Sequence, residues 1–167
     1  RTSGNHFQTL INKIPNLNWA GGTSRPRYFQ IRGVGERSHY FGEGTPNFSI
    51  GFVLDNMDLS GLGMIGQLYD LEQIEIYKGS QSSNFGANAL GGLISIKSND
   101  PKDKFEFGST LSVGSNNHSG YKLLFNLNPF QNLSFRITSD YNYEDGFRIN
   151  KSRNITNSNK RDEIVNR

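Results

Sequence analysis

The sequence contains no cysteine among its 167 residues. This absence excludes disulfide bonds and thiolate metal sites, although it does not fix the compartment of the protein. The three histidines, His6, His39 and His118, lie too far apart in the sequence to indicate a metal site. We therefore expect neither a bound metal nor another cofactor.

The sequence also lacks a concentration of charge of one sign. Its 18 Lys and Arg residues are interspersed with 15 acidic residues, and the net charge is only +3. Nucleic-acid binding usually requires a basic patch or stripe, so we expect no nucleic-acid partner.

Long hydrophobic runs are missing as well, and none approaches the ~18 residues of a transmembrane helix. A transmembrane β-strand needs only about ten alternating residues, so a β-barrel stays open. The chain begins without Met or a signal peptide, and it ends inside a polar stretch, RDEIVNR. We interpret it as a piece of a longer protein.

Glycine and aromatic residues are abundant, with 19 Gly, 12 Phe and 7 Tyr. Such a composition favours short strands and turns over a helical bundle. A helical pattern covers residues 5–14, and a turn with a short helix is expected between residues 60 and 72. Apolar runs that resemble strands occupy residues 27–33, 49–55, 73–79 and 92–98. This first part reads as a small mixed α/β domain that ends within residues 98–104.

From residue 105 onward the pattern changes to strict alternation, which predicts three strands of about ten residues with one apolar face. Most apolar side chains of these strands occupy odd positions: Phe105, Phe107, Leu111, Val113, Tyr121, Leu123, Phe125, Leu127, Leu133, Phe135, Ile137, Tyr141 and Tyr143. A soluble sandwich with one buried face shows the same alternation. From this pattern alone, a membrane barrel and a soluble sheet both stay open.

The connections between these strands favour the membrane barrel. A tight PFQN turn joins the second and third strands, and a long polar stretch follows the third. Short turns on one side and long loops on the other are typical of outer-membrane barrels, as are aromatic bands at the two interfaces. We expect one band from Phe105, Phe107 and Phe130, and the other from Tyr121, Tyr141 and Tyr143.

One segment, GLGMIG, matches a dinucleotide-binding fingerprint through Gly61, Gly63 and Gly66. That fingerprint requires a strand, a tight turn and a long helix within a βαβ unit. Here the spacing to the flanking strands is wrong, so a soluble dinucleotide-dependent enzyme is the weaker alternative. The acidic residues lack a paired histidine or a nucleophile elbow, and we expect no enzymatic activity.

Three segments together closely resemble the plug domain of TonB-dependent outer-membrane receptors. They are YFQIRGVGE, GFVLDNMDL and LYDLEQIEIYKGSQSSNFGANALGGLISIKS, within residues 7–100. The last segment follows the family's closing pattern at Ile74, Glu75, Ile76, Lys78, Gly79, Phe85, Gly86, Ala89, Gly91, Gly92, Ile94 and Ile96. It departs from that pattern at Ser80, where proline is usual, at Lys78, where arginine is commoner, and at Phe85, where tyrosine is.

The resemblance implies an α+β plug domain over residues 1–102, with a small mixed sheet and short helices. It implies that residues 103–167 are the first antiparallel strands of a truncated transmembrane β-barrel, whose ~22 strands enclose a plugged lumen. TonB with its inner-membrane energising complex and the lipid of the outer membrane would be the partners. The implied cargo is a scarce solute, most commonly a ferric siderophore, with cobalamin, haem and oligosaccharides as alternatives. A binding or adhesion module without active transport is a further alternative.

The same resemblance suggests two groups of functional residues. The first lies in loops that the family turns outward, where cations and flat side chains could meet an anionic metal chelate: Arg37, His39, Tyr40, Phe41, Leu62 and Met64. The second group is expected to stabilise the plug or latch it by ion pairs and tight turns: Arg32, Gly33, Asp55, Glu72, Glu75, Lys78, Gly79, Gly86, Gly91 and Gly92. In a plug, these glycines would serve packing and turns and would bind no phosphate.

Overall fold

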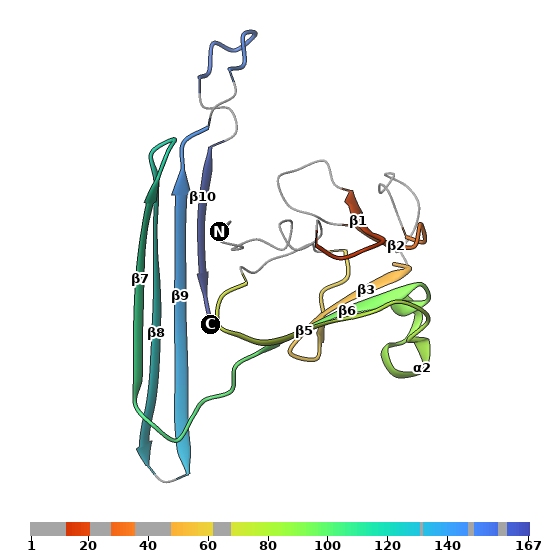
Figure 1. The fold of residues 1–167 in the computed structure, drawn as a ribbon, viewed down its shortest axis with the longest axis horizontal. Coiled ribbons are helices and arrows are strands. Elements are labelled where there is room, and N and C mark those ends of the chain that lie inside the picture. Colours follow the sequence, from red (N-terminus) through yellow and green to blue (C-terminus); the bar gives the residue numbers. More distant parts are fainter. Residues whose placement is uncertain are drawn as a thin grey trace. The chain divides into compact units, whose positions relative to one another are not determined.

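The computed structural model describes residues 13–20, 28–35, 48–61, 68–130, 132–146, 149–156 and 160–167. The chain divides into two compact units, of which the first ends at Asn99 and the second begins at Asp100 (Figure 1). Among the described residues, no helix has the length and apolar character needed to cross a membrane.

The first unit is built on a four-stranded mixed sheet in the order β4-β3-β6-β5. Its strands are β3 (Ile50–Leu54), β4 (Met57–Asp58), β5 (Leu71–Tyr77) and β6 (Gly92–Ser98). The two central strands, β3 and β6, run parallel, whereas β4 and β5 pair with them antiparallel at the edges. A separate antiparallel pair is formed by β1 (Leu17–Ala20) and β2 (Tyr28–Ile31).

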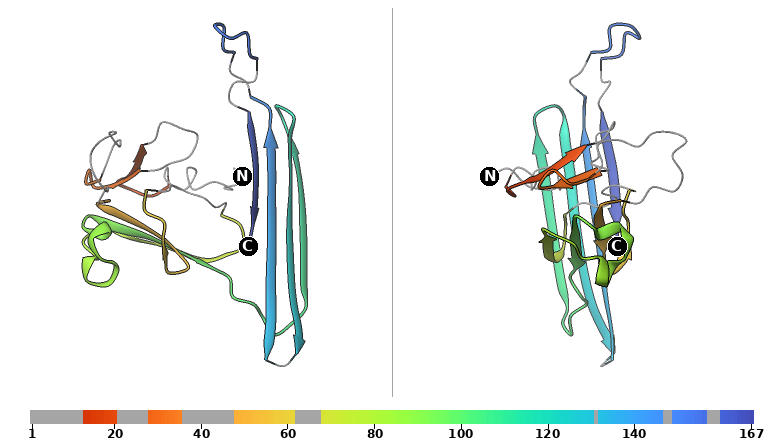
Figure 2. Two further views of the ribbon diagram at one scale, coloured as in Figure 1. Left: turned by 180° about the vertical axis from the view of Figure 1, so that it is seen from behind. Right: turned by 90° about the vertical axis from the view of Figure 1, so that its right-hand side faces the viewer.

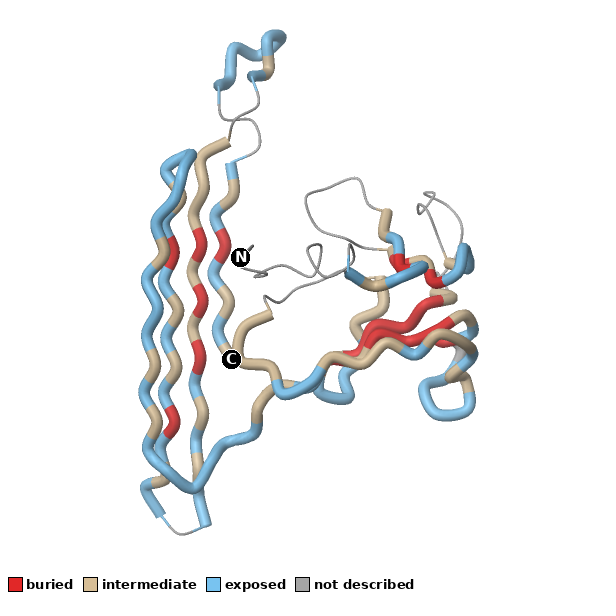
Figure 3. The backbone as a smooth tube through the Cα atoms, in the orientation of Figure 1, coloured by how far each residue is buried: buried red, intermediate tan, exposed pale blue. Residues whose placement is uncertain are grey.

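The core of this unit lies on the central strands, which Figure 3 colours as buried. β3 is apolar throughout, and the first five residues of β6 are apolar apart from Ser95, as expected for strands flanked on both sides. The buried cluster joins both sheets: Leu17, Phe29, Ile31, Ile50, Phe52, Ile94 and Ile96. The rings of Phe29 and Phe52 stack within it, with centroids 5.6 Å apart.

The predicted strands at residues 27–33, 49–55, 73–79 and 92–98 are confirmed as β2, β3, β5 and β6. The sequence did not reveal β1, the two-residue β4, or the short helices α2 (Ser82–Phe85) and η1 (Ala87–Ala89) between β5 and β6. The helical patterns expected at 5–14 and 60–72 fall mostly outside the described residues.

The second unit is an antiparallel sheet in the order β10-β9-β8-β7, with each strand beside its neighbour in sequence (Figure 2). Its strands are β7 (Glu106–Gly114), β8 (His118–Phe130), β9 (Leu133–Glu144) and β10 (Arg161–Asn166). The first three confirm the predicted strands, whereas β10 lies in a stretch that had been read as polar loop. The β7–β8 turn at 115–117 lies at the same end of this sheet as the end of β9 and the start of β10, and the short β8–β9 turn lies at the other end.

The two faces of this sheet differ in polarity in the sense opposite to that of a soluble protein. Side chains at odd positions are apolar and exposed, with Leu111 at 84%, Val113 at 87% and Ile137 at 57%. The buried residues of these strands are polar: Asn126, Thr138, Asp140, Asn142 and Glu163. Soluble sheets bury their apolar face, so the pattern is that of a wall with apolar surroundings on one side.

The cross-strand register brings aromatic side chains of the exposed face together at two places. Tyr121 pairs with Tyr141, and their rings stack with centroids 5.2 Å apart. Nearer the opposite end, the ring of Phe125 meets those of Phe105 and Phe107 edge-on, at 5.7 and 5.8 Å. Tyr121 and Tyr141 thus lie together as predicted, whereas the ring that packs against Phe105 and Phe107 is that of Phe125, in the middle of β8. The expected band of Phe105, Phe107 and Phe130 stays a prediction.

Candidate functional site

The Arg32-Gly33 pair forms a two-residue turn directly after β2. Ile31 and Val34 exchange both backbone hydrogen bonds, at 2.9 and 3.0 Å, across these two residues. Arg32 and Gly33 both have positive φ, 55° and 82°, as the central residues of a type I′ turn require. The Arg32 N–H also donates to the Asn16 carbonyl at 2.9 Å, which joins this turn to the residue before β1.

Asp55 occupies a second two-residue turn, between β3 and β4. Asp55 and Asn56 have φ values of 48° and 66°, and asparagine tolerates this conformation better than most residues. The Asp55 carboxylate accepts hydrogen bonds from the Ser98 N–H at 2.7 Å and from the Ser98 hydroxyl at 2.8 Å. This carboxylate therefore fastens the turn to the end of β6, which is a structural role.

Gly91 and Gly92 lie where the chain enters β6 against neighbouring elements. A Cβ on Gly91 would come within 2.5 Å of Cγ1 of Val34. A Cβ on Gly92, whose φ is 158°, would come within 2.6 Å of the Tyr77 carbonyl oxygen and 2.7 Å of Cδ1 of Ile31. Close packing therefore requires glycine at both positions. Gly79 and Gly86 follow β5 and α2 with φ of 147° and 75°, in open space.

Three of the predicted latch residues lie on β5 or directly after it: Glu72, Glu75 and Lys78. In the structure, each of them contacts a residue outside this group of three. Glu72 pairs with Lys97 of the adjacent strand at 2.6 Å, and both side chains are about half exposed. Glu75 accepts hydrogen bonds from Gln73 and from the Tyr77 hydroxyl, both at 2.6 Å, and the latter bond raises the pKa of Tyr77. Lys78 donates to the Pro15 carbonyl at 2.9 Å.

Beside these motifs the first unit has an open cavity of about 330 Å³. Its floor is apolar and includes the buried residues Val53, Ala89 and Leu93. Its remaining lining comes from β3, the β4 region and the α2–η1 segment: Gly51, Asn56, Asp58, Ser60, Asn84, Phe85, Gly86 and Asn88. Phe85 is 38% exposed and gives the cavity an aromatic edge.

Asp58 organises the polar side of this cavity. Its two carboxylate oxygens accept hydrogen bonds from the Ser60 N–H at 2.9 Å and from the Asn88 amide at 3.0 Å. Partial burial would raise the pKa of Asp58, but the hydrogen bonds from Ser60 and Asn88 outweigh it and lower the pKa below its ordinary value. Asn88 also accepts from the Phe48 N–H at 3.2 Å, so the network ties β4 to η1 and to the start of β3.

The polar face of the second unit carries its own charged pairs. Lys122 on β8 lies 3.4 Å from the Asp140 carboxylate on β9, and Asn142 donates to the same carboxylate at 2.7 Å. Asp140 is only 2% exposed. Buried charges of this kind are stabilised by pairing and hydrogen bonding, so this face of β8 and β9 can hold buried charge.

All six predicted ligand-binding residues lie outside the described residues: Arg37, His39, Tyr40, Phe41, Leu62 and Met64. Within the described part of the chain, no group of three or more His, Cys, Asp or Glu side chains could hold a metal ion. The cavity and its residues Asp58, Phe85 and Asn88 did not emerge from the sequence. The only hint was that Phe85 replaces the family's usual tyrosine.

Comparison with known proteins gives the family directly. The family described as TonB-dependent Receptor Plug Domain matches residues 1–93. The chain belongs to this family. The suspected resemblance is thereby confirmed.

Solved receptor structures share the fold of both units. The ferric-catecholate import receptor Fiu from E. coli K12 is 19% identical, with a TM-score of 0.64 over 89% of this chain and 20% of that one. The pyoverdine outer membrane receptor FpvA from Pseudomonas aeruginosa PAO1 is 16% identical, with a TM-score of 0.66 over 86% of this chain and 20% of that one. The ferric yersiniabactin uptake receptor FyuA from Yersinia pestis is 22% identical, with a TM-score of 0.67 over 90% and 23%.

The chain therefore spans about a fifth of the length of these receptors. The predicted fold class is confirmed: a plug fold with a mixed sheet is followed by antiparallel strands like those of TonB-dependent receptor barrels.

Proposed function

We propose that the protein containing this chain is an outer-membrane receptor that imports a scarce solute by TonB-dependent active transport, with a ferric siderophore as cargo. Residues 1–102 form its plug, and residues 103–167 form the first strands of its barrel. TonB and its energising complex supply the force, and the plug resides in the barrel lumen. No covalent chemistry is needed for this task.

The inverted sheet of the second unit is the observation that carries the proposal. Its exposed face is apolar over β7, β8 and β9, and its other face holds buried groups such as Asp140 and Asn126. Lipid on one side and a polar lumen on the other satisfy both faces at once. A soluble sheet would leave a large apolar surface in water.

Membership in the plug family and the cargo of similar receptors support the choice of solute. Fiu and FyuA are described as import receptors for ferric-catecholate and ferric yersiniabactin, and FpvA is described with bound pyoverdine. These descriptions favour a ferric chelate over cobalamin, haem or an oligosaccharide.

Two parts of the plug are proposed to contact the solute. One is the set of loops with Arg37, His39, Tyr40, Phe41, Leu62 and Met64, whose cations suit an anionic chelate. The other is the cavity beside α2, where Phe85 offers a flat apolar surface next to the amides of Asn84 and Asn88. Aromatic side chains give large contact area at low entropic cost.

The test is uptake of radioactive iron by a strain that lacks the gene and is complemented with the full-length gene. Ferric catecholate, hydroxamate and carboxylate chelates would be supplied separately under iron limitation. The proposal predicts energy-dependent uptake of one chelate class that disappears when tonB is deleted. Phe85→Ala should weaken that uptake about tenfold at limiting concentration, whereas Leu90→Ala, an exposed apolar residue outside the cavity lining, should not.

Three results would change or overturn this proposed function. Uptake of cobalamin, haem or oligosaccharide in place of iron would replace the cargo and keep the mechanism. Binding of a solute without TonB-dependent accumulation would indicate a binding or adhesion module. Recovery of the full-length protein in the aqueous fraction after lysis would overturn the receptor assignment itself.

A further inference from the structure

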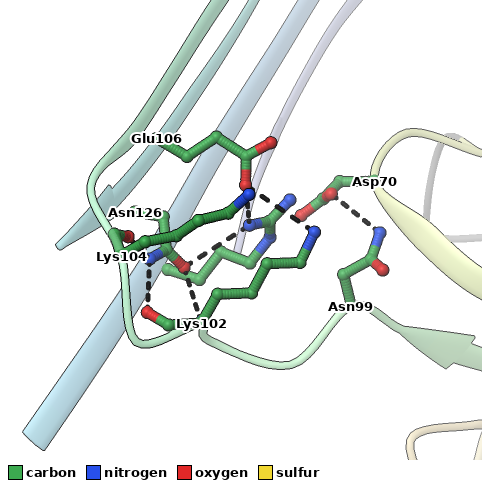
Figure 4. A network of polar contacts seen from close by, with 7 residues as sticks. Asp70, Asn99, Lys102, Lys104, Glu106 and Asn126 are labelled. Carbon is green, nitrogen blue, oxygen red and sulfur yellow. Dashed lines mark hydrogen bonds and ion pairs between the residues drawn. The ribbon is translucent and has the colours of Figure 1, made fainter. Parts of the chain in front are cut away.

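Asn126 on β8 is a fully buried side chain, with 0% exposure, on the polar face of the second unit. Its amide nitrogen donates to the carbonyls of Lys102 at 2.7 Å and Lys104 at 2.5 Å. Its amide oxygen accepts from the Lys102 N–H at 2.9 Å (Figure 4). One side chain thus binds the backbone of the segment that leads into β7.

These side-chain contacts hold residues 102–104, which make no backbone pairing with β8. The first backbone pair of β7 with β8 is Glu106 with Asn126, and residues 102–104 precede the start of the strand. A side-chain amide presents the same donor and acceptor as a peptide group. Asn126 therefore continues the hydrogen-bonded ladder beyond its last backbone pair, to the residues that precede β7 in the sequence.

An ion pair between Arg136 on β9 and Glu106 on β7 also contacts Asn126. Arg136 on β9 is the register partner of Asn126, and its guanidinium is 6% exposed. It lies 3.3 Å from the Glu106 carboxylate and 3.4 Å from the Asn126 amide oxygen. Glu106, Asn126 and Arg136 thus form one row across β7, β8 and β9. This row and the segment 102–104 are called the linker clamp below.

We propose that Asn126 is a positioning residue that fixes the chain where it enters the barrel wall, so that force on the plug does not peel β7 from β8. The proposal rests on the proposed TonB-dependent function, in which the plug is pulled. Tension on the first unit reaches the second along the backbone after Asn99. Without the linker clamp, that tension would load the end of the β7–β8 ladder and open its hydrogen bonds one after another.

With the linker clamp, the load falls on several hydrogen bonds at once, ahead of the first ladder pair. The Asn126 side chain is fully buried and its bonds are partly buried, so water competes with them less than it does at an exposed strand end. The plug can then be displaced from its amino-terminal side while residues from Lys102 onward stay with the wall.

Single-molecule force spectroscopy of the full-length receptor in a lipid bilayer tests this, with the plug pulled from its amino-terminal end. Asn126→Leu keeps the size of the side chain and removes its hydrogen bonds, and Asn126→Asp keeps the acceptor and loses both donors. Thr110→Val removes a hydroxyl from the same face of β7 and is the matched control. The rupture that follows extension of the chain up to Lys102 should need about half the force in Asn126→Leu. Asn126→Asp should give an intermediate force, and Thr110→Val the wild-type force.

Several outcomes would overturn the proposal. Wild-type rupture force in both Asn126 variants would do so, as would an equal loss in Thr110→Val. Faster hydrogen exchange at the Lys102 amide with unchanged rupture force would reduce Asn126 to a local structural role. If Asn126→Leu fails to assemble as a heat-modifiable barrel, Asn126→Asp decides alone. Rupture force needs no cargo, so a failure of TonB-dependent uptake in the wild type counts against the proposed function and leaves this test intact.

Discussion

Gly92 shows how one position can be restricted in two ways at once. Its φ of 158° is rarely adopted by other residues, and a Cβ would lie 2.6 Å from the Tyr77 carbonyl oxygen. Gly79 has a similar φ of 147°, but nothing lies within 4 Å of its Cβ position. The two glycines therefore separate the cost of backbone conformation from the cost of crowding.

We predict that Gly92→Ala destabilises the plug by about 2 kcal/mol more than Gly79→Ala does, because only the former forces atoms together. Hydrogen exchange of the β3 and β6 amides in the full-length receptor measures the free energy of opening the plug. Equal losses in the two variants would mean that the space around Gly92 can relax.

Asp58 gives a prediction with a pH dependence. Its folded pKa lies below the ordinary value of 3.8, so its contribution to stability is present above that value and is lost as pH falls through the folded pKa. Asp58→Asn should lower the opening free energy of the plug by about 1 kcal/mol at pH 7, since the hydrogen bond from Asn88 loses its acceptor.

The difference between wild type and Asp58→Asn should shrink as the pH falls below about 4. In an Asn88→Ala background the same replacement should cost less at pH 7. A difference that stays constant from pH 7 to pH 3, measured by the same exchange experiment, would contradict this account of Asp58.

At the scale of the element, hydrophobic patterns in the sequence predicted most of the strands. The remaining strands form because a neighbouring strand offers an edge to pair with, which a local pattern does not show. β3 is a continuous apolar run, β6 holds Leu93, Ile94 and Ile96, and β7 to β9 largely alternate, so the sequence alone predicted them. β10 has only Ile164 and Val165 as apolar residues, and its other residues in the strand are polar or charged. It forms because β9 offers a complete edge, and such a partner cannot be seen in a local pattern.

The short elements of the plug were missed for a similar reason. β1 and β2 pair across a separation in sequence, and only Leu17 of β1 is buried. α2 is a single turn of four residues without a side-chain cap. Such elements carry little periodicity, and tertiary packing determines them.

Adjacent leucines on β8 provide a test of the two faces. Leu123 is 41% exposed on the apolar face, whereas Leu124 lies on the polar face beside Thr138 and Gly108. Leu123→Arg should destabilise the assembled barrel by about 2–4 kcal/mol if it lies near the bilayer midplane, and Leu124→Arg by much less. Urea titration of the receptor in lipid vesicles measures both. A larger loss in Leu124→Arg would reverse the assignment of the faces.

At the scale of the whole molecule, the family and the fold class could be predicted from the sequence, because the plug motifs have a fixed order and spacing. The residues that pair with individual charged side chains could not be predicted from the sequence. Glu72 was expected to take part in an ion pair without its partner being named, and the structure pairs it with Lys97 on the neighbouring strand. The cavity around Asp58 was also missed, since it joins β4 to the α2–η1 segment, and no local pattern records that contact.

The central claim is that β8 faces lipid with its odd-numbered side chains and an enclosed polar space with its even-numbered ones. The most direct measurement places single spin labels on β8 of the full-length receptor in a bilayer, through Tyr121→Cys, Lys122→Cys, Leu123→Cys, Leu124→Cys and Phe125→Cys. The chain has no cysteine of its own to interfere. Labels at 121, 123 and 125 should be relaxed strongly by oxygen dissolved in the lipid, and labels at 122 and 124 weakly. Relaxation by oxygen that does not alternate along the strand, or that alternates in the opposite phase, would contradict the account.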